Sequence, residues 1–174
     1  MVVDSINNSV GFLHPDSLGL LAETNFEVDG AYLLGAMGLD YLGMSYIYLY
    51  FSNGTIILID GMVFKQYSVY QSEVQINQLQ PINNGLQVLA CTDDGNLLIF
   101  SGIETKSIKL LKRLKVNKVE SISNFIITKR SDPGKNDYDL ALSTNEGLLF
   151  VKLVCPFSRY NQYQIQLNQE EDIP

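Results

Sequence analysis

The sequence predicts an all-β fold made of short antiparallel sheets with four strands each, and three observations lead to this prediction. Apolar runs of strand length alternate with short polar turns along the chain. Three of these turns end in glycine, at Gly54, Gly95 and Gly147, and each stands between two apolar runs. The 174 residues are 46% hydrophobic, which is enough to form a core, and we expect a single domain over residues 1–174.

Three segments share one plan: an apolar strand, a tight polar turn and a second apolar strand. These hairpin repeats cover residues 46–60, 86–100 and 138–152. Asn53, Asp94 and Glu146 stand directly before the three glycines. Asn-Gly and Asp-Gly are strong hairpin signals because a two-residue turn needs positive φ, which costs glycine little. We therefore expect two-residue turns that align on the glycines.

The spacing of the glycines predicts propeller blades. The interval is 41 residues from Gly54 to Gly95 and 52 residues from Gly95 to Gly147, while one four-stranded blade takes about 40 to 45 residues. The longer interval fits if the polar segment 129–137 is a surface insertion. Two more strands fit after the first hairpin, over residues 62–70 and 74–82, and two after the second, over residues 108–114 and 121–128. This order of inner, outer and innermost strands is that of a β-propeller.

The segments Ser52-Asn53-Gly54 and Asp93-Asp94-Gly95 resemble the hairpin between the second and third strands of WD40 repeats. The resemblance covers about residues 30–168 and rests on the pattern, because the chain has no Trp and no Gly-His pair before a repeat. Asp60 is the only residue near the place of the family's aspartate. The resemblance implies a partial or small β-propeller that binds other proteins. The alternative is a β-sandwich built from the same hairpins.

The number of repeats bears on whether the ring closes. Three hairpins and one degenerate repeat before Gly30 make at most about four blades, whereas common propellers have four to eight. An open ring has unpaired strand edges, and such edges pair with other chains. We therefore expect a propeller fragment, or a propeller that a protein partner completes; a small four-bladed ring is the alternative.

Catalytic and cofactor-binding patterns are missing from the sequence. The single histidine, His14, stands before a proline, and we interpret it as a loop or strand-end residue. The glycines between Gly35 and Gly43 lack the spacing of a phosphate-binding loop, so we expect an innermost strand or a strand edge there. Acidic pairs at the hairpins are interpreted as turn residues. We expect no enzyme activity, no cofactor and no metal.

The most apolar stretch of the sequence and its two cysteines indicate in which compartment the protein resides. Residues 31–51 are the most apolar stretch, but they include Asp40 and five tyrosines, and their second half alternates tyrosines with plain hydrophobes as a strand does. We therefore expect no membrane span. The only two cysteines, Cys91 and Cys155, form no CxxC motif, which fits a reducing compartment. We expect a cytoplasmic protein, of the cytoskeleton or another assembly.

Charge is distributed unevenly. The chain has a net charge of -7, yet residues 106–135 hold nine basic and two acidic residues. Lysines on an outer strand commonly protect an exposed edge from aggregation. Alternatively, the segment binds an acidic protein tail, anionic lipid head groups or a nucleic-acid backbone, although the overall negative charge disfavours nucleic acid. The candidate partner-binding residues are Lys106, Lys109, Lys112, Arg113, Lys115, Lys118, Lys129, Arg130 and Lys135.

Repeats without a catalytic pattern favour a scaffold. We predict an intracellular protein–protein interaction scaffold that is a subunit of a larger assembly, although propeller folds also host enzymes. The alternative function is a binder of anionic surfaces through the basic segment 106–135.

Overall fold

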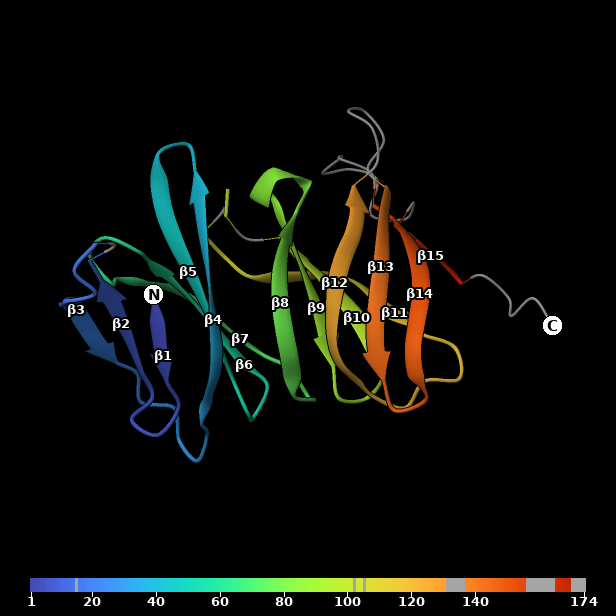
Figure 1. Cartoon of the computed structure of the whole chain (residues 1–174), viewed down its shortest axis with the longest axis horizontal. Coiled ribbons are helices and arrows are strands. Elements are labelled where there is room, and N and C mark those ends of the chain that lie inside the picture. The colour runs from blue at the N-terminus through green and yellow to red at the C-terminus, as the bar shows by residue number, and fades with distance from the viewer. Residues whose placement is uncertain (15, 102, 105, 131–136, 156–164, 170–174) are drawn as a thin grey trace.

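The computed structural model describes the chain except for residues 15, 102, 105, 131–136, 156–164 and 170–174, and except for the side chains of residues 129, 130 and 169. Its strands form four antiparallel sheets that follow one another along the chain (Figure 1). We number these sheets from the N-terminal end. In each sheet, every strand pairs with the strand that precedes or follows it in the sequence.

The first sheet has three strands, β1 (Val2–Asp4), β2 (Ser9–Leu13) and β3 (Leu20–Asn25). The second has four, β4 (Leu33–Tyr41), β5 (Met44–Phe51), β6 (Thr55–Asp60) and β7 (Gln66–Gln71). The third has β8 (Ile76–Ile82), β9 (Gln87–Thr92), β10 (Asn96–Ser101) and β11 (Lys109–Lys115), with a 3-10 turn η1 (Asn83–Gly85) after β8. The fourth has β12 (Ile122–Arg130), β13 (Asp137–Thr144), β14 (Gly147–Val154) and β15 (Gln166–Gln169).

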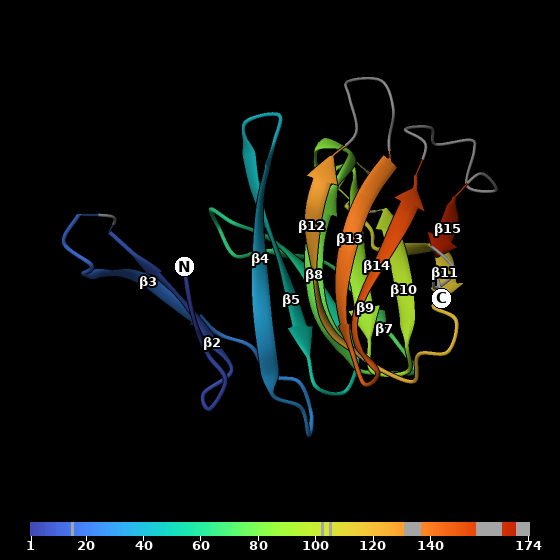
Figure 2. The same ribbon diagram turned by 45° about the vertical axis from the view of Figure 1, so that its right-hand side comes forward.

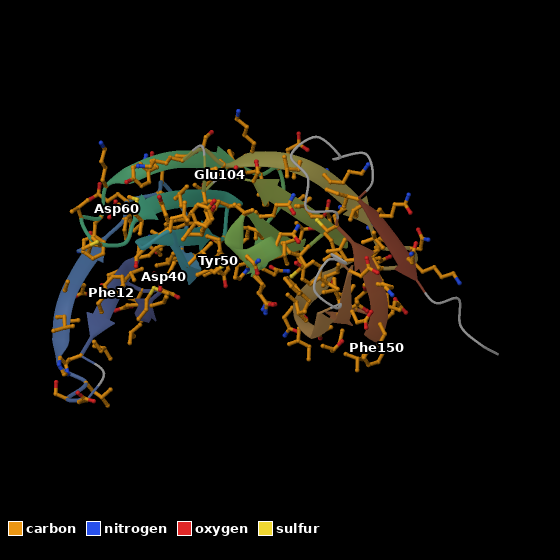
Figure 3. All side chains as sticks on the ribbon, turned by 90° about the horizontal axis from the view of Figure 1, so that it is seen from above. Phe12, Asp40, Tyr50, Asp60, Glu104 and Phe150 are labelled. Atoms are coloured by element: carbon orange, nitrogen blue, oxygen red, sulfur yellow. The ribbon has the colours of Figure 1, made fainter. Side chains whose placement is uncertain are left out.

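The four-stranded sheets are arranged as propeller blades. Strands β4, β8 and β12 are the innermost strands, and β8 contacts both of the others across the sheet boundaries (Figure 2). Seen from above, the four sheets stand along an open arc, with the first and fourth sheets at its two ends (Figure 3). This radial arrangement confirms the predicted partial propeller and rules out the β-sandwich. Residues 35–41 of the glycine-containing segment belong to the innermost strand β4, as expected, and Gly43 lies in the turn to β5.

Apolar cores fill the three boundaries between neighbouring sheets, and β5 shows how alternation produces them. Its tyrosines 46, 48 and 50 contribute to the core between the second and third sheets. Ile47, Leu49 and Phe51 point the other way and contribute to the core between the first and second sheets. Because neighbouring side chains of a strand point to opposite faces, one strand serves two cores.

Two of the three hairpin turns differ from the expected two-residue form, whereas the third, between β13 and β14, has two residues. Three residues separate β5 from β6 and β9 from β10, and these turns end in Gly54 and Gly95 at φ +83° and +73°. A Cβ on Gly95 would lie 2.3 Å from the Val119 carbonyl oxygen, so both conformation and space require glycine. In the third hairpin, Gly147 is already a strand residue and pairs with Thr144. The alignment on Gly147 is therefore wrong by one residue, which exchanges the two faces of β14.

The first sheet corresponds to the last three strands of a blade. The outer strands β3, β7 and β11 are each followed by a residue whose N–H donates to the carbonyl oxygen that ends the hairpin turn: Phe26 to Asn8 at 2.9 Å, Ser72 to Gly54 at 3.0 Å, and Val116 to Gly95 at 3.1 Å. Strand β1 therefore takes the position of β5 and β9. Among the described residues, no strand fills the innermost position beside β1. This sheet is the degenerate repeat expected before residue 30.

Amide side chains of β8 bond to the backbone of β12. Asn77 Nδ2 donates to the Ile122 carbonyl oxygen at 2.8 Å. The Phe125 N–H donates to Gln78 Oε1 at 2.7 Å. Strand β12 is the inner edge of its sheet, so these bonds supply partners for backbone groups that the sheet itself leaves unpaired.

A second polar link joins η1 to β13 inside the core. The Tyr138 hydroxyl accepts a hydrogen bond from the Asn83 N–H at 2.7 Å and donates to Asn83 Oδ1 at 2.8 Å. Both residues are buried. Asn83 Nδ2 also donates to the Cys155 carbonyl oxygen at 3.3 Å, so the third and fourth sheets are joined by directional bonds as well as by apolar contact.

Tyr138→Phe tests this link. The change leaves the buried Asn83 N–H and Oδ1 without the hydroxyl, so we expect the free energy of unfolding to fall by about 1–3 kcal/mol. Equilibrium urea unfolding followed by circular dichroism measures it. Tyr32→Phe is the control, because the Tyr32 side chain is 67% exposed. Equal stability of Tyr138→Phe and the unaltered protein would contradict the assigned role.

Candidate interaction surfaces

Metal-ligating side chains do not gather at one place in the described part of the chain. There, no three His, Cys, Asp or Glu side chains lie together as a metal site requires. His14 lies in the loop after β2, where its Nδ1 accepts hydrogen bonds from the Asp16 and Ser17 N–H groups at 3.2 and 3.4 Å. Burial raises the pKa of the Cys91 and Cys155 thiols to about 12, so both stay protonated at neutral pH. The described residues include no helix with the length and apolar character needed to cross a membrane.

The structure places most of the candidate basic residues on and beside β11, the outer edge strand of the third sheet. Lys109, Arg113 and Lys115 are exposed on this strand, and Lys112 is half-buried. Lys106 and Lys118 are exposed in the turns on either side. These six residues thus occupy one strand and its two ends. The three others stand apart: Lys135 and the side chains of Lys129 and Arg130 lie outside the described residues.

Lys106 connects the third sheet to the second. Its Nζ lies 4.6 Å from the centre of the Tyr67 ring and 3.5 Å from the Tyr67 hydroxyl oxygen. The Tyr67 hydroxyl donates to Asp60 Oδ2 at 2.7 Å, and the N–H groups of Met62 and Val63 donate to Oδ1. Figure 3 shows Asp60 near the outer strands. A cation above an exposed ring contributes about 0.5–1 kcal/mol, so Lys106 has a structural role beside any role in binding.

Hydrogen bonds set the charge of Asp60. The Tyr67 hydroxyl has the largest effect in lowering the pKa of this carboxyl from its usual 3.8, followed by the N–H groups of Met62 and Val63. Lys106 makes a smaller contribution in the same direction. Because the pKa is lower in the folded state, the stability that Asp60 contributes is present above the unfolded pKa and is lost as the pH falls through the folded pKa.

Tyr67→Phe tests this assignment. Removal of the hydroxyl is expected to raise the pKa of Asp60 toward 3.8, because the largest cause of the shift is lost. Carbon-13 NMR of the carboxyl group, followed over acidic pH in both proteins, measures the change. Tyr32→Phe is the control and leaves the Asp60 titration in place. An Asp60 pKa that is the same with and without the Tyr67 hydroxyl would show that the cause is wrongly assigned.

Part of the positive charge on β11 is balanced within its own sheet. Lys115 Nζ donates to the Asp94 carbonyl oxygen. Burial acts to raise the pKa of the Asp94 carboxyl, but hydrogen bonds from Thr92 and Asn96 and the charges of Arg113 and Lys115 lower it overall. The hairpin between β9 and β10 therefore holds a negative charge close to the basic strand.

Strand β14 exposes apolar side chains that the equivalent strands bury. Strand β6 is buried along its whole length, and β10 nearly so. In β14, by contrast, Leu148 is 68% exposed and Phe150 is 56% exposed. Ile126 of β12, 59% exposed, shares their side of the sheet, because Ile126 and Phe150 both pair with Ala141. We call this surface, formed by Ile126, Ala141, Leu148 and Phe150, the end face.

The strand register identifies the counterparts of the end face. Leu148 pairs with Ser143 one step from its turn, as Leu97 pairs with Cys91 and Ile56 with Tyr50. Leu97 and Ile56 are buried against the sheet that follows their own. The end face is therefore the side that a following sheet covers elsewhere in the molecule, and Phe150 lies on it at the end of the arc (Figure 3).

Sequence reasoning missed the end face for a definable reason. Alignment on Gly147 assigns Leu149 and Val151 to this side, whereas both contribute to the core against the third sheet. The signal that could have found it is the lack of a good turn former at Glu146, which marks a hairpin unlike the other two.

Known propeller structures share this fold. The C-terminal WD40 domain of Sif2 aligns with a TM-score of 0.62 over 86% of this chain and 40% of that chain, at 10% identity. The WD40 β-propeller domain of Doa1 aligns with a TM-score of 0.59 over 87% of this chain and 48% of that chain, at 15% identity. Dihydro-heme d1 dehydrogenase NirN, in complex with DHE, aligns with a TM-score of 0.62 over 96% of this chain and 34% of that chain, at 16% identity. No family model and no curated protein matches the sequence.

These comparisons define the fold of the chain as a WD40-like β-propeller. The chain spans less than half the length of each of these three structures. Because one of them is a dehydrogenase, the fold alone does not decide between binding and catalysis. The surfaces of the chain therefore have to indicate its function.

Proposed function

We propose that this chain is a non-catalytic, protein-binding scaffold of the cytoplasm, a segment of β-propeller whose end face is covered by another polypeptide in a larger assembly. The observation that carries the proposal is the exposure of Leu148 and Phe150 at a position where the second and third sheets bury their residues. Burial of a large apolar side chain contributes about 1.5–3 kcal/mol. Contiguous exposed apolar residues mark interaction surfaces.

The inner edge of the first sheet supports the same proposal. In the other three sheets a long innermost strand stands beside the strand that corresponds to β1. In the described residues β1 pairs only with β2. An extended segment of a partner that adds to this edge would complete a four-stranded sheet, which is a common mode of protein recognition.

A photo-reactive residue at position 150 tests the proposal. We expect p-benzoylphenylalanine in place of Phe150 to cross-link to a polypeptide in cells, because the end face is covered there, and mass spectrometry identifies the product. The same residue in place of Val69, which is 50% exposed on the outer strand β7, is the matched control. A cross-link yield at position 150 no higher than at position 69 would refute the docking role of the end face.

Binding of an anionic surface is the second candidate function. The observation that favours it is the exposure of Lys109, Arg113 and Lys115 along one edge strand. Lysine and arginine near an anionic membrane surface contribute about 1 kcal/mol each, and added salt screens this attraction.

Charge reversal of Lys109, Lys112, Arg113 and Lys115 to Glu tests this candidate. We expect the chain to sediment with phosphatidylserine-containing vesicles and the variant to lose this binding, with the end face unaffected. Vesicles of phosphatidylcholine alone are the control, and increasing salt is expected to weaken the interaction. Equal sedimentation of the variant and the unaltered chain would exclude the basic strand as a binding site.

A further inference from the structure

We propose that the polypeptide covering the end face is a second copy of this chain, which docks through the outer side of its first sheet, so that two arcs form one ring. This inference rests on the proposed function, because it names the partner of the same end face. It requires that the first sheet present a side that fits a preceding sheet.

The outer side of the first sheet meets this requirement. Gly11 lies three residues after Asn8, the end of its turn, as Ile57 lies three residues after Gly54 and Leu98 after Gly95. Ile57 and Leu98 are buried against the sheet that precedes their own. The side of the first sheet that carries Gly11 is therefore the one that a preceding sheet would cover.

This side of the first sheet carries exposed apolar side chains beside Gly11, and the exposed Glu23, which pairs with Gly11, lies at its outer-strand edge. Val2 pairs with Gly11, and Leu13 pairs with Leu20. Val2 is 49% exposed and Leu20 is 59% exposed. Leu20 Cδ1 would lie 3.1 Å from a Cβ on Gly11, so the leucine side chain lies over the glycine. We call this surface, formed by Val2, Gly11, Leu13 and Leu20, the start face.

The two faces are complementary by position. The end face is a side that a following sheet covers, and the start face is a side that a preceding sheet covers. A head-to-tail contact between two copies therefore repeats the boundary that already exists three times within the chain. Such contacts form a ring when the rotation closes. Four sheets from each copy give eight, which lies within the range of about four to eight blades in common propellers.

Two further observations support a second copy. The chain covers 40% and 48% of two WD40 domains with the same fold, so two copies match most of one such ring. At the boundary between the second and third sheets, the third strands of the two sheets, β6 and β10, contribute to the same core through Leu58 and Leu98. Contact between β14 and the partner's β2 therefore does not depend on an innermost strand beside β1.

Two complementary variants test the proposal in the full chain. Phe150→Asp disables the end face, and Leu20→Asp disables the start face. Both positions are more than half exposed, so neither change is expected to disturb folding; circular dichroism checks this, and Leu148→Ser and Val2→Ser serve as milder substitutes. Val69→Asp is the control. Size-exclusion chromatography with light scattering measures the molar mass.

The expected results are specific to a head-to-tail contact. The unaltered chain and Val69→Asp have twice the mass of one chain, and each face variant alone shows a twofold loss to the mass of one chain. An equimolar mixture of Phe150→Asp and Leu20→Asp regains the double mass, because one intact end face meets one intact start face. A dimer that survives Leu20→Asp, or a mixture that stays at the mass of one chain, overturns the proposal.

The failure of this inference and the failure of the proposed function have different signatures. An unaltered chain with the mass of one copy, together with a cross-link from position 150 to a different polypeptide, overturns the second copy and supports the scaffold. An unaltered chain with the mass of one copy and no cross-link from position 150 above the control overturns both.

Discussion

A propeller sheet has two apolar faces, and each face needs a neighbour. In this chain the requirement is met for the second and third sheets, whose third strands β6 and β10 are buried along almost their whole length. The hydrophobic effect that drives this burial depends on area and not on direction, so the sheets attract one another wherever their faces match in shape. The first and fourth sheets each have one satisfied face and one that water still covers. The candidate interaction surfaces of the molecule are these two uncovered faces.

Directional bonds then decide how the sheets are aligned. The amide side chains of Asn77 and Gln78 reach from β8 to the backbone of β12, and the Asn83–Tyr138 pair joins the same two sheets in the core. Asn8 has a similar place at the first boundary, where its side chain accepts from the Leu33 N–H at 2.7 Å. Charge has a smaller part, since Lys106, Asp60 and Tyr67 connect outer strands at the surface.

Local patterns in the sequence predicted the individual sheets but not the contacts between neighbouring sheets. The alternation of tyrosines with Ile47, Leu49 and Phe51 sets the faces of β5, and Gly54 and Gly95 mark the turns, because both signals depend on residues near in sequence. The face of β14 depends on whether its turn has two or three residues, and the glycine pattern was misleading at Gly147. The links made by Asn83 and Asn8 were not predictable, because their partners become neighbours only in the folded chain. The basic residues of β11 were predicted to lie on an outer strand, and they do; their role in binding stays a prediction.

The open arc also has a consequence for how the molecule holds together. In the described residues the apolar cores join each sheet to the next along the chain, so the arc is a linear array in which stability is the sum of unit terms and nearest-neighbour terms, as in a repeat protein. The terminal units have one coupling each, whereas the second and third sheets have two, so we expect unfolding to start at the ends and amide protons to exchange soonest there. Closure into a ring removes the ends of the array. The same sequence would then change from a chain that frays into one that unfolds as a single cooperative unit.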